Sequence, residues 1–151
     1  MTSFADVPSL RKVFNDSSKS SGISKLLEVL LEACNVIGCD IRSCKYSTNT
    51  VGTSNLFGDN QLEVDVKTDE IIFDLLKSSQ LVHVASSEEN PQEVSCGGSG
   101  YSVAFDPLDG SSIIDCNFAV GTIIGVWPGN GLVGRYGREQ VSLSIYLYFR
   151  I

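Results

Sequence analysis

Apolar residues recur every three or four positions in a stretch near the start of the chain. The apolar positions are Ile23, Leu27, Leu30, Leu31 and Cys34. This spacing places their side chains along one face of a helix, with polar residues on the other face. We therefore predict an amphipathic helix over residues 23–37, ended by the turn Gly38-Cys39-Asp40.

A second helical pattern follows a polar stretch that is punctuated by glycine. Residues 47–61 read STNTVGTSNLFGDNQ, which is typical of a flexible loop. Thr68 is then a candidate N-cap, because two acidic residues occupy the first turn after it. The apolar residues on the inner face are Ile71, Ile72, Leu75 and Leu76. The pattern predicts a helix from Thr68 to Lys77.

Three short apolar segments later in the chain have the composition of β-strands. They are LVHVAS at 81–86, YSVAFD at 101–106 and VGTIIGVW at 120–127. Helices followed by strands predict a layered α/β (α+β) domain. His83 is the only histidine and lies inside the first segment, where we expect a packed or surface side chain and not a catalytic one.

The charge balance narrows the range of partners. The chain has 18 acidic and 11 basic residues, a net charge of −7, which repels phosphate backbones and anionic membranes. It has no long apolar run, and its first 25 residues lack the apolar core of a secretory signal. We therefore expect a cytoplasmic protein that binds neither nucleic acid nor membrane, with a plastid location as the alternative.

The five cysteines do not form a recognisable motif. They are Cys34, Cys39, Cys44, Cys96 and Cys116. None has the C-x-x-C spacing that zinc and redox sites prefer. We interpret them as reduced thiols, and a regulatory thiol pair is the alternative.

Acidic residues follow two of the predicted strands directly. Glu88 and Glu89 come after the first strand, and Asp106 and Asp109 come at the end of the second. If the two strands are parallel neighbours, their carboxyl ends place the four carboxylates together. Such a cluster must raise its pKa values or bind a cation, and oxygen ligands select Mg²⁺ or Mn²⁺.

The segment FDPLDGSSIID, residues 105–115, carries the most specific spacing in the chain. Pro107 restricts the turn, so that Asp106 and Asp109 can face one ion while the Leu108 carbonyl adds a neutral ligand. The amides at 110–112 can then hold a phosphate group. An ordinary surface turn is the alternative interpretation of these residue types.

The longer segment FDPLDGSSIIDCNFAVGTIIGVWPG resembles the signature of the class 1 fructose-1,6-bisphosphatase family, and its second part is most similar to the sedoheptulose-bisphosphatase branch. The resemblance extends upstream through FGDNQLEVDVKTDEIIFDLLKSS and ASSEEN and covers residues 23–141. It implies an α-β-α-β-α sugar-phosphatase fold. It also implies an Mg²⁺-dependent sugar-bisphosphate 1-phosphatase of carbohydrate metabolism, such as the Calvin cycle. Sedoheptulose 1,7-bisphosphate is the expected substrate and fructose 1,6-bisphosphate the alternative.

The resemblance also implies roles for single residues. The implied metal ligands are Glu88, Asp106, the Leu108 carbonyl, Asp109 and Asp59. The implied catalytic acids, which position or deprotonate the attacking water, are Asp65 and Glu89. The implied phosphate-binding turn is Gly110, Ser111 and Ser112. Family members are homo-oligomers, which the resemblance implies here as well.

The family's domain is longer than this chain, which ends on the apolar strand-like segment LYFRI. We expect residues 1–21 to form a loosely ordered arm and residues 22–151 to form the N-terminal half of the phosphatase domain. An uncovered sheet edge and face are expected at this strand, with poor solubility or dependence on a partner. A non-catalytic fragment of such an enzyme is the remaining alternative.

Overall fold

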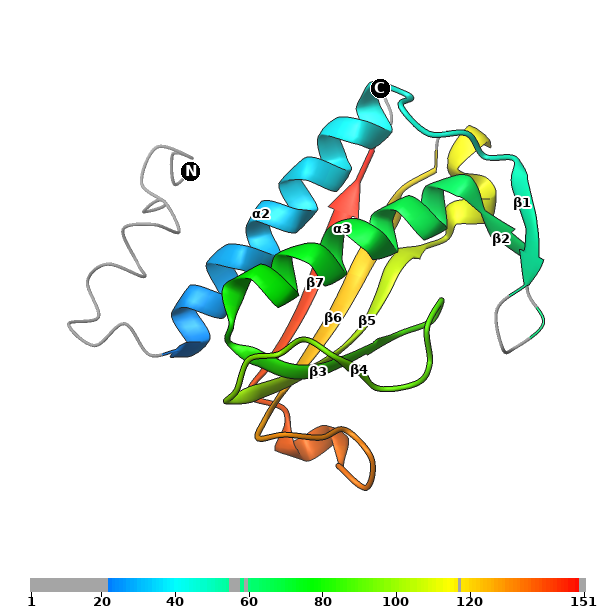
Figure 1. Ribbon diagram of the computed structural model, residues 1–151. Helices are drawn as coiled ribbons and strands as arrows, with labels where there is room; N and C mark the ends of the chain where they lie inside the picture. The colour runs from blue at the N-terminus through cyan, green and yellow to red at the C-terminus, as the bar shows by residue number, and fades with distance from the viewer. Residues whose placement is uncertain (1–21, 55–57, 59, 117, 150–151) are drawn as a thin grey trace, which may run out of the picture.

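Two helices cover one face of a five-stranded sheet in the computed structural model, which describes residues 22–54, 58, 60–116 and 118–149 (Figure 1). The predicted arm at 1–21 and the predicted ligand Asp59 lie outside the described residues. The helices are α2 (Gly22–Arg42) and α3 (Glu63–Ser79), and the short 3₁₀ helices are η2 (Ser111–Cys116) and η3 (Gly137–Glu139). The strands are β1 (Thr50–Ser54), β2 (Asn60–Leu62), β3 (Val82–Ser87), β4 (Val94–Ser95), β5 (Tyr101–Asp109), β6 (Val120–Pro128) and β7 (Ser142–Tyr148).

The sheet has the strand order β4-β3-β5-β6-β7. The pair β3–β5 is parallel, and the other neighbours are antiparallel. The helix α3 crosses over the sheet before β3 begins, so the predicted layered α/β (α+β) fold is confirmed (Figure 1). The three predicted strands are confirmed as β3, β5 and β6, although β5 extends three residues beyond the predicted end at Asp106.

The core lies between the two helices and the sheet. Its fully buried side chains include Leu26, Leu30, Ile37, Ile72, Leu76, Val103, Ile124 and Val126. Burying an aliphatic side chain of this size contributes roughly 1.5–3 kcal/mol to folding. Phe73 of α3 meets Phe105 of β5 edge to face, with ring centroids 5.2 Å apart. This contact anchors α3 over the strand that carries the acidic motif.

The predicted end of the first helix at Gly38 is wrong, because α2 continues to Arg42. Gly38 is buried against β7, and a Cβ atom there would lie 3.2 Å from the Tyr148 ring. The glycine therefore permits close approach of the helix to the sheet and does not stop the helix. The buried face also differs from the prediction, since Leu26 is fully buried whereas Leu27 and Leu31 are half-buried.

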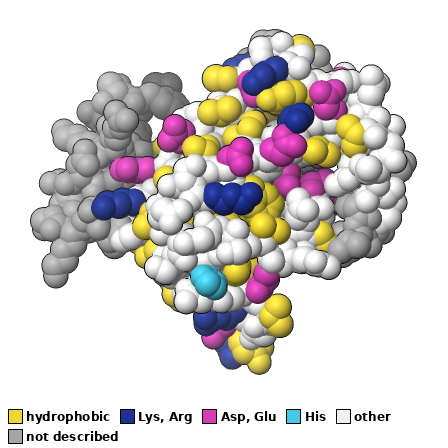
Figure 2. Space-filling model, in the orientation of Figure 1, with side chains coloured by type: hydrophobic (Ala, Val, Ile, Leu, Met, Phe, Trp, Pro, Cys, Tyr) yellow, Lys and Arg dark blue, Asp and Glu magenta, His cyan; other side chains and the backbone are white. Residues whose placement is uncertain are grey.

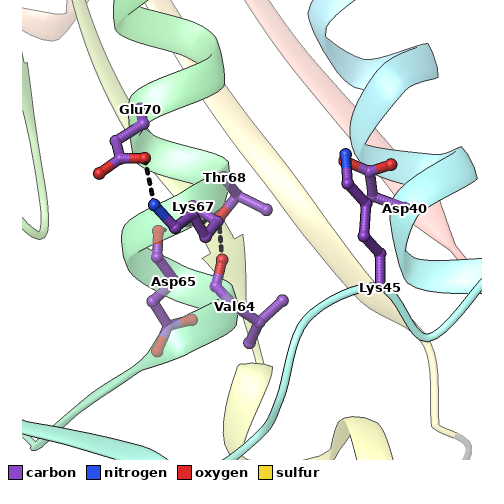
Figure 3. A network of polar contacts seen from close by, with 7 residues as sticks. All are labelled: Asp40, Lys45, Val64, Asp65, Lys67, Thr68 and Glu70. Carbon is purple, nitrogen blue, oxygen red and sulfur yellow. Dashed lines mark hydrogen bonds and ion pairs between the residues drawn. The ribbon is translucent and has the colours of Figure 1, made fainter.

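The predicted start of the second helix at Thr68 is also wrong. The helix begins at Glu63, and the carboxylate of Asp65 accepts a hydrogen bond from the Leu62 amide at 3.1 Å. Thr68 is fully buried one turn later and donates to the Val64 carbonyl at 2.8 Å (Figure 3). An aspartate in the first turn thus takes the capping role that the sequence pattern assigns to threonine.

The segment 47–61, predicted to be a loop, contains an antiparallel pair of strands. β1 pairs with β2 through Thr50↔Leu62 and Ser54↔Asn60. The two strands have few apolar residues, so the pair has little hydrophobic signal in the sequence. It continues directly into α3 and brings Leu62 to the start of that helix.

Strand β7 is the edge strand of the described sheet and alternates between two environments. Tyr148 is buried toward α2, whereas Leu143, Ile145 and Leu147 are each at least 60% exposed on the opposite face. The expected uncovered edge and apolar face are therefore present. In the described part of the chain, no helix is long and apolar enough to span a bilayer.

Acidic side chains are interspersed with basic ones on the face that carries the helices, and this face shows no continuous basic patch (Figure 2). Two ion pairs lie on this side of the fold, Lys45 with Asp40 and Lys67 with Glu70 (Figure 3). The Lys67–Glu70 pair is exposed on both sides and contributes at most about 1 kcal/mol, whereas Asp40 of the other pair is buried.

We predict that the apolar face of β7 drives self-association. Replacing Leu143, Ile145 and Leu147 together by threonine keeps strand propensity and removes the exposed aliphatic surface. The association constant, measured by sedimentation velocity, should fall roughly tenfold or more, since each buried aliphatic side chain contributes on the order of 1.5–3 kcal/mol. Val133→Thr changes an isolated side chain that is 90% exposed and serves as the control. Equal association of the triple variant and the unchanged chain would contradict this prediction.

Candidate active site

A cleft with a volume of ≈ 540 Å³ opens where β3 and β5 end. The predicted site residues that line it are Asp65, Glu88, Glu89, Asp106, Leu108, Asp109, Gly110, Ser111 and Ser112. They come from three separate segments of the chain: α3, the connection after β3, and the end of β5 with the turn that follows it. The structure therefore brings together every predicted site residue except Asp59, which lies outside the described residues.

Parallel pairing of β3 with β5 creates the cleft. Ser87 lies opposite Phe105, and the Glu88 amide donates to the Phe105 carbonyl at 3.2 Å. β3 therefore ends beside Phe105, and Glu88 follows it next to Asp106, although β5 itself continues to Asp109. This confirms that the two strands are parallel neighbours, the condition under which the sequence predicted a carboxylate cluster.

A β-bulge allows Asp106 and Asp109 to serve the same cleft. In a regular strand, residues three apart point to opposite faces. Here Asp106 pairs with Ile123 and Asp109 pairs with Gly121, so β5 uses one more residue than β6 over this interval. The extra residue turns both carboxylates toward the cleft. Within the bulge, the Leu108 amide donates to Asp106 Oδ1 at 3.0 Å.

The turn after the bulge is built on Gly110, whose φ of +83° is in the left-handed region. Glycine adopts this conformation without a steric penalty. The 3₁₀ helix η2 follows, and the Ile113 amide donates to the Gly110 carbonyl at 3.0 Å. Gly110, Ser111 and Ser112 therefore line the cleft directly beside the two aspartates.

Three carboxyl groups in the cleft have raised pKa values. Burial, reinforced by the negative charge of Glu88, raises the pKa of Asp106 to about 7. Burial also raises the pKa of Asp65, and a hydrogen bond with the Ser111 side chain opposes this shift. The pKa of Glu89 is raised by burial, against a hydrogen bond from Gln61 Nε2 to its Oε2 at 2.5 Å. The charged forms of these three carboxyl groups are therefore disfavoured in the cleft.

The donor set of the cleft fits a hard divalent cation. Carboxylates and a backbone carbonyl are the oxygen ligands that Mg²⁺ and Mn²⁺ prefer, and the described residues that line this cleft include no cysteine or histidine. Within the described residues, no three acidic side chains are already arranged at ligand spacing around one point. Burial and then the charge of Glu88 raise the pKa of Asp106, and a cation would offset the repulsion between these carboxylates.

A hydrogen-bonded pair behind the two glutamates, Asp69 with Asn90, was not predicted from the sequence, and we call it the Asn90 clamp. Asp69 of α3 is 4% exposed, and its Oδ2 accepts from Asn90 Nδ2 at 2.6 Å. The backbone amide of Asn90 donates to Ser87 Oγ at 2.9 Å. Hydrogen bonds therefore hold both ends of segment 87–90, which carries Glu88. Burial raises the pKa of Asp69. The available signal was its position four residues after Asp65, on the same helix face.

The chain is similar in sequence to proteins of one family over nearly its whole described length. Residues 9–149 match the family model described as fructose-1-6-bisphosphatase, N-terminal domain. Over 143 residues, the chain is 43% identical to the chloroplastic sedoheptulose-1,7-bisphosphatase of Spinacia oleracea, covering 93% of this chain and 36% of that protein. It is 39% identical to a class 1 fructose-1,6-bisphosphatase of Pelobacter propionicus, covering 92% of this chain and 43% of that protein.

A solved structure gives the same result for the fold. Leishmania major fructose-1,6-bisphosphatase in holo form superposes with a TM-score of 0.80 at 27% identity. The match covers 94% of this chain and 49% of that chain. The chain thus spans half or less of the length of these relatives.

We predict a pH-dependent loss of stability in the metal-free chain that originates at Asp106. A free aspartate ionises near pH 4 and Asp106 near pH 7, so the folded state holds this proton more tightly than the unfolded state. The free energy of unfolding should therefore fall as the pH rises through this interval. Urea unfolding in the presence of a chelator should show a steeper fall for the unchanged chain than for Asp106→Asn. Parallel pH profiles for the two proteins would refute the assignment.

We predict that the Asn90 clamp stabilises the fold. Asn90→Ala removes the amide that compensates a buried carboxylate, and this should lower the free energy of unfolding by about 1–3 kcal/mol. The swapped pair Asp69→Asn with Asn90→Asp retains one carboxylate and one amide and should recover most of the loss. Urea unfolding measures both variants. An Asn90→Ala variant as stable as the unchanged chain would show that the clamp contributes nothing.

Proposed function

Because the chain belongs to the fructose-1,6-bisphosphatase family, we propose that its cleft hydrolyses a phosphate monoester of a sugar bisphosphate with the help of Mg²⁺. The observation that carries the proposal is the convergence of Glu88, Asp106 and Asp109 beside the Gly110–Ser112 turn. Acidic groups next to the amides of a turn suit a substrate phosphate only when a cation offsets their charge. Residues 22–151 would then form the N-terminal half of a larger phosphatase domain.

The proposed metal ligands are the oxygen groups at the bulge. Glu88, Asp106, the Leu108 carbonyl and Asp109 would hold Mg²⁺, with Mn²⁺ as an alternative ion, and Asp59 is retained as a further ligand from the family resemblance alone. When bound, the ion would supply charge neutralisation for the phosphoryl oxygens and a more acidic water. The bulge supports this set because it presents Asp106 and Asp109 to one cleft.

Asp65 and Glu89 are the proposed catalytic acids. The Leu62 amide donates to Asp65 Oδ2, and Gln61 Nε2 donates to Glu89 Oε2, so one oxygen of each carboxylate is held by a hydrogen bond. Their raised pKa values bring them closer to neutral pH, where a general base is most effective. In this proposal, the second oxygen of Glu89 takes the proton of the attacking water, and Asp65 orients that water.

The turn at 110–112 is the proposed phosphate site. Its amides follow a left-handed glycine and are placed at the cleft surface, where they can donate to the oxygens of the transferred phosphoryl group. Ser111 also contacts Asp65, which links the phosphate site to the water-orienting acid. In this proposal, the scissile phosphate would lie between the amides of the turn and the carboxylates of the cleft.

Sedoheptulose 1,7-bisphosphate is the preferred substrate in this proposal, with sedoheptulose 7-phosphate and phosphate as products. The preference rests on the similarity to proteins named sedoheptulose-1,7-bisphosphatase in Spinacia oleracea and other photosynthetic organisms. Fructose 1,6-bisphosphate is the second candidate, because bacterial relatives with comparable identity carry that name. The chloroplastic names of the plant relatives support the plastid alternative over the cytoplasmic expectation. A homo-oligomeric state stays a prediction.

We predict Mg²⁺-dependent phosphate release by this chain. Release should be fastest from sedoheptulose 1,7-bisphosphate, slower from fructose 1,6-bisphosphate and slowest from inositol monophosphate. Asp109→Asn should lower kcat about a hundredfold or more, since it removes an electrostatic element of the cleft. Asp74→Asn makes the same charge change at an exposed position on α3 and should keep full activity.

The result that would contradict the proposal is an absence of release from all three substrates by folded protein, with Asp109→Asn behaving identically. That outcome would favour the non-catalytic alternative. Equal activity with and without a chelator would contradict the role of the cation but not the phosphatase activity.

A further inference from the structure

One residue of β6 lies opposite the bulge in β5. The flanking pairs are Asp106↔Ile123 and Asp109↔Gly121, so Thr122 faces both Pro107 and Leu108. Thr122 is fully buried, and its hydroxyl donates to the Pro107 carbonyl at 2.8 Å. The Thr122 side chain of β6 is therefore hydrogen-bonded to the backbone of the bulge in β5.

The direction of the hydrogen bonds around Thr122 follows from its single hydroxyl proton. That proton is used in the bond to Pro107, so the Tyr148 hydroxyl, 2.8 Å away, must donate to Thr122 Oγ1. The Cys34 thiol of α2 also contacts both hydroxyls. The result is a one-way chain from β7 through Thr122 to the bulge, in which each hydroxyl proton has a defined acceptor.

A hydroxyl at this position needs an explanation that strand formation does not provide. The next two residues of β6 are Ile123 and Ile124, so an aliphatic β-branched residue suits the strand and the core. A buried hydroxyl costs free energy unless it is hydrogen-bonded. The bond to Pro107 compensates this cost and at the same time satisfies a carbonyl that lies between the two aspartates.

We propose that Thr122 is a positioning residue for the cleft: its hydroxyl holds the Pro107 carbonyl and so maintains the bulge that presents Asp106 and Asp109 together. The expected effect of Thr122 on metal binding rests on the proposed function, since the two aspartates are proposed metal ligands. Its structural part, the dependence of the bulge on the hydroxyl, stands on the contacts of Thr122 alone.

The test compares variants of the full chain in two measurements. Thr122→Val keeps the shape and removes the hydroxyl, Thr122→Ser restores the hydroxyl, and Thr122→Ala replaces Val if that variant does not fold. Ser102→Ala is the matched control. Ser102 is also buried, and its hydroxyl donates to the Gly129 carbonyl at 2.8 Å, at the end of β5 far from the bulge. The two readouts are Mn²⁺ affinity by electron paramagnetic resonance and amide exchange of Leu108 in the metal-free chain.

We expect Thr122→Val to weaken Mn²⁺ binding about tenfold or more, as loss of an outer contact of a metal site does. Exchange of the Leu108 amide, which donates to Asp106 Oδ1, should become faster in the same variant. Thr122→Ser should return both values to within about threefold of the unchanged chain. Ser102→Ala should leave both values unchanged even where it lowers stability.

Unchanged exchange and unchanged Mn²⁺ affinity in Thr122→Val would overturn the inference, and so would equal effects of Ser102→Ala and Thr122→Val. A chain that binds no Mn²⁺ at all, but shows the expected exchange differences, would remove the proposed metal-dependent function and leave the positioning role of Thr122 supported. The two claims therefore fail on different measurements.

Discussion

Parallel pairing between β3 and β5 is the interaction on which the cleft depends. It ends two strands at one edge of the sheet and places Glu88 beside the acidic end of β5. The bulge in β5 then corrects the three-residue spacing that would send Asp106 and Asp109 to opposite faces. Backbone geometry thus concentrates acidic side chains in one place, and burial of Asp65 and partial burial of Asp106 reduce the screening of their charge by water.

Neighbouring elements hold the end of β5 that carries the acidic residues. The contact between Phe73 and Phe105 anchors α3 above β5, and the same helix supplies Asp65 to the cleft. On the far side, Thr122 and Tyr148 carry a buried chain of hydroxyls to the bulge. The site is therefore held by regular elements on both sides, which is the arrangement that keeps a charged cluster in a defined geometry.

Much of this arrangement could be predicted from the sequence, because its signals are local. The three strands have compact apolar runs, and the spacing of acids after two of them indicated a shared edge. The start of α3 was missed because its cap comes from Asp65 reaching back to Leu62, whereas Thr68 offers the usual N-cap residue type. Gly38 was misinterpreted for a similar reason, since a glycine needed for close approach to Tyr148 looks the same in sequence as one that ends a helix.

The parts that could not be predicted depend on contacts between distant segments. Nothing local to Asp69 indicates that Asn90 will bond to it, and nothing local to Thr122 indicates a carbonyl fifteen residues earlier as its acceptor. The pair β1–β2 was missed because its residues are mostly polar and carry no hydrophobic alternation. In each case, tertiary context decides a role that residue type leaves open.

The central claim is that the carboxylates of the cleft bind a divalent cation in the folded state. The most direct test is the free energy of unfolding of the unchanged chain at pH 8, measured by urea titration over increasing Mg²⁺ concentration. Binding to the folded state predicts a logarithmic rise, about 2.7 kcal/mol at a hundredfold excess over the dissociation constant. A free energy of unfolding that does not change with Mg²⁺, at constant ionic strength, would contradict the claim.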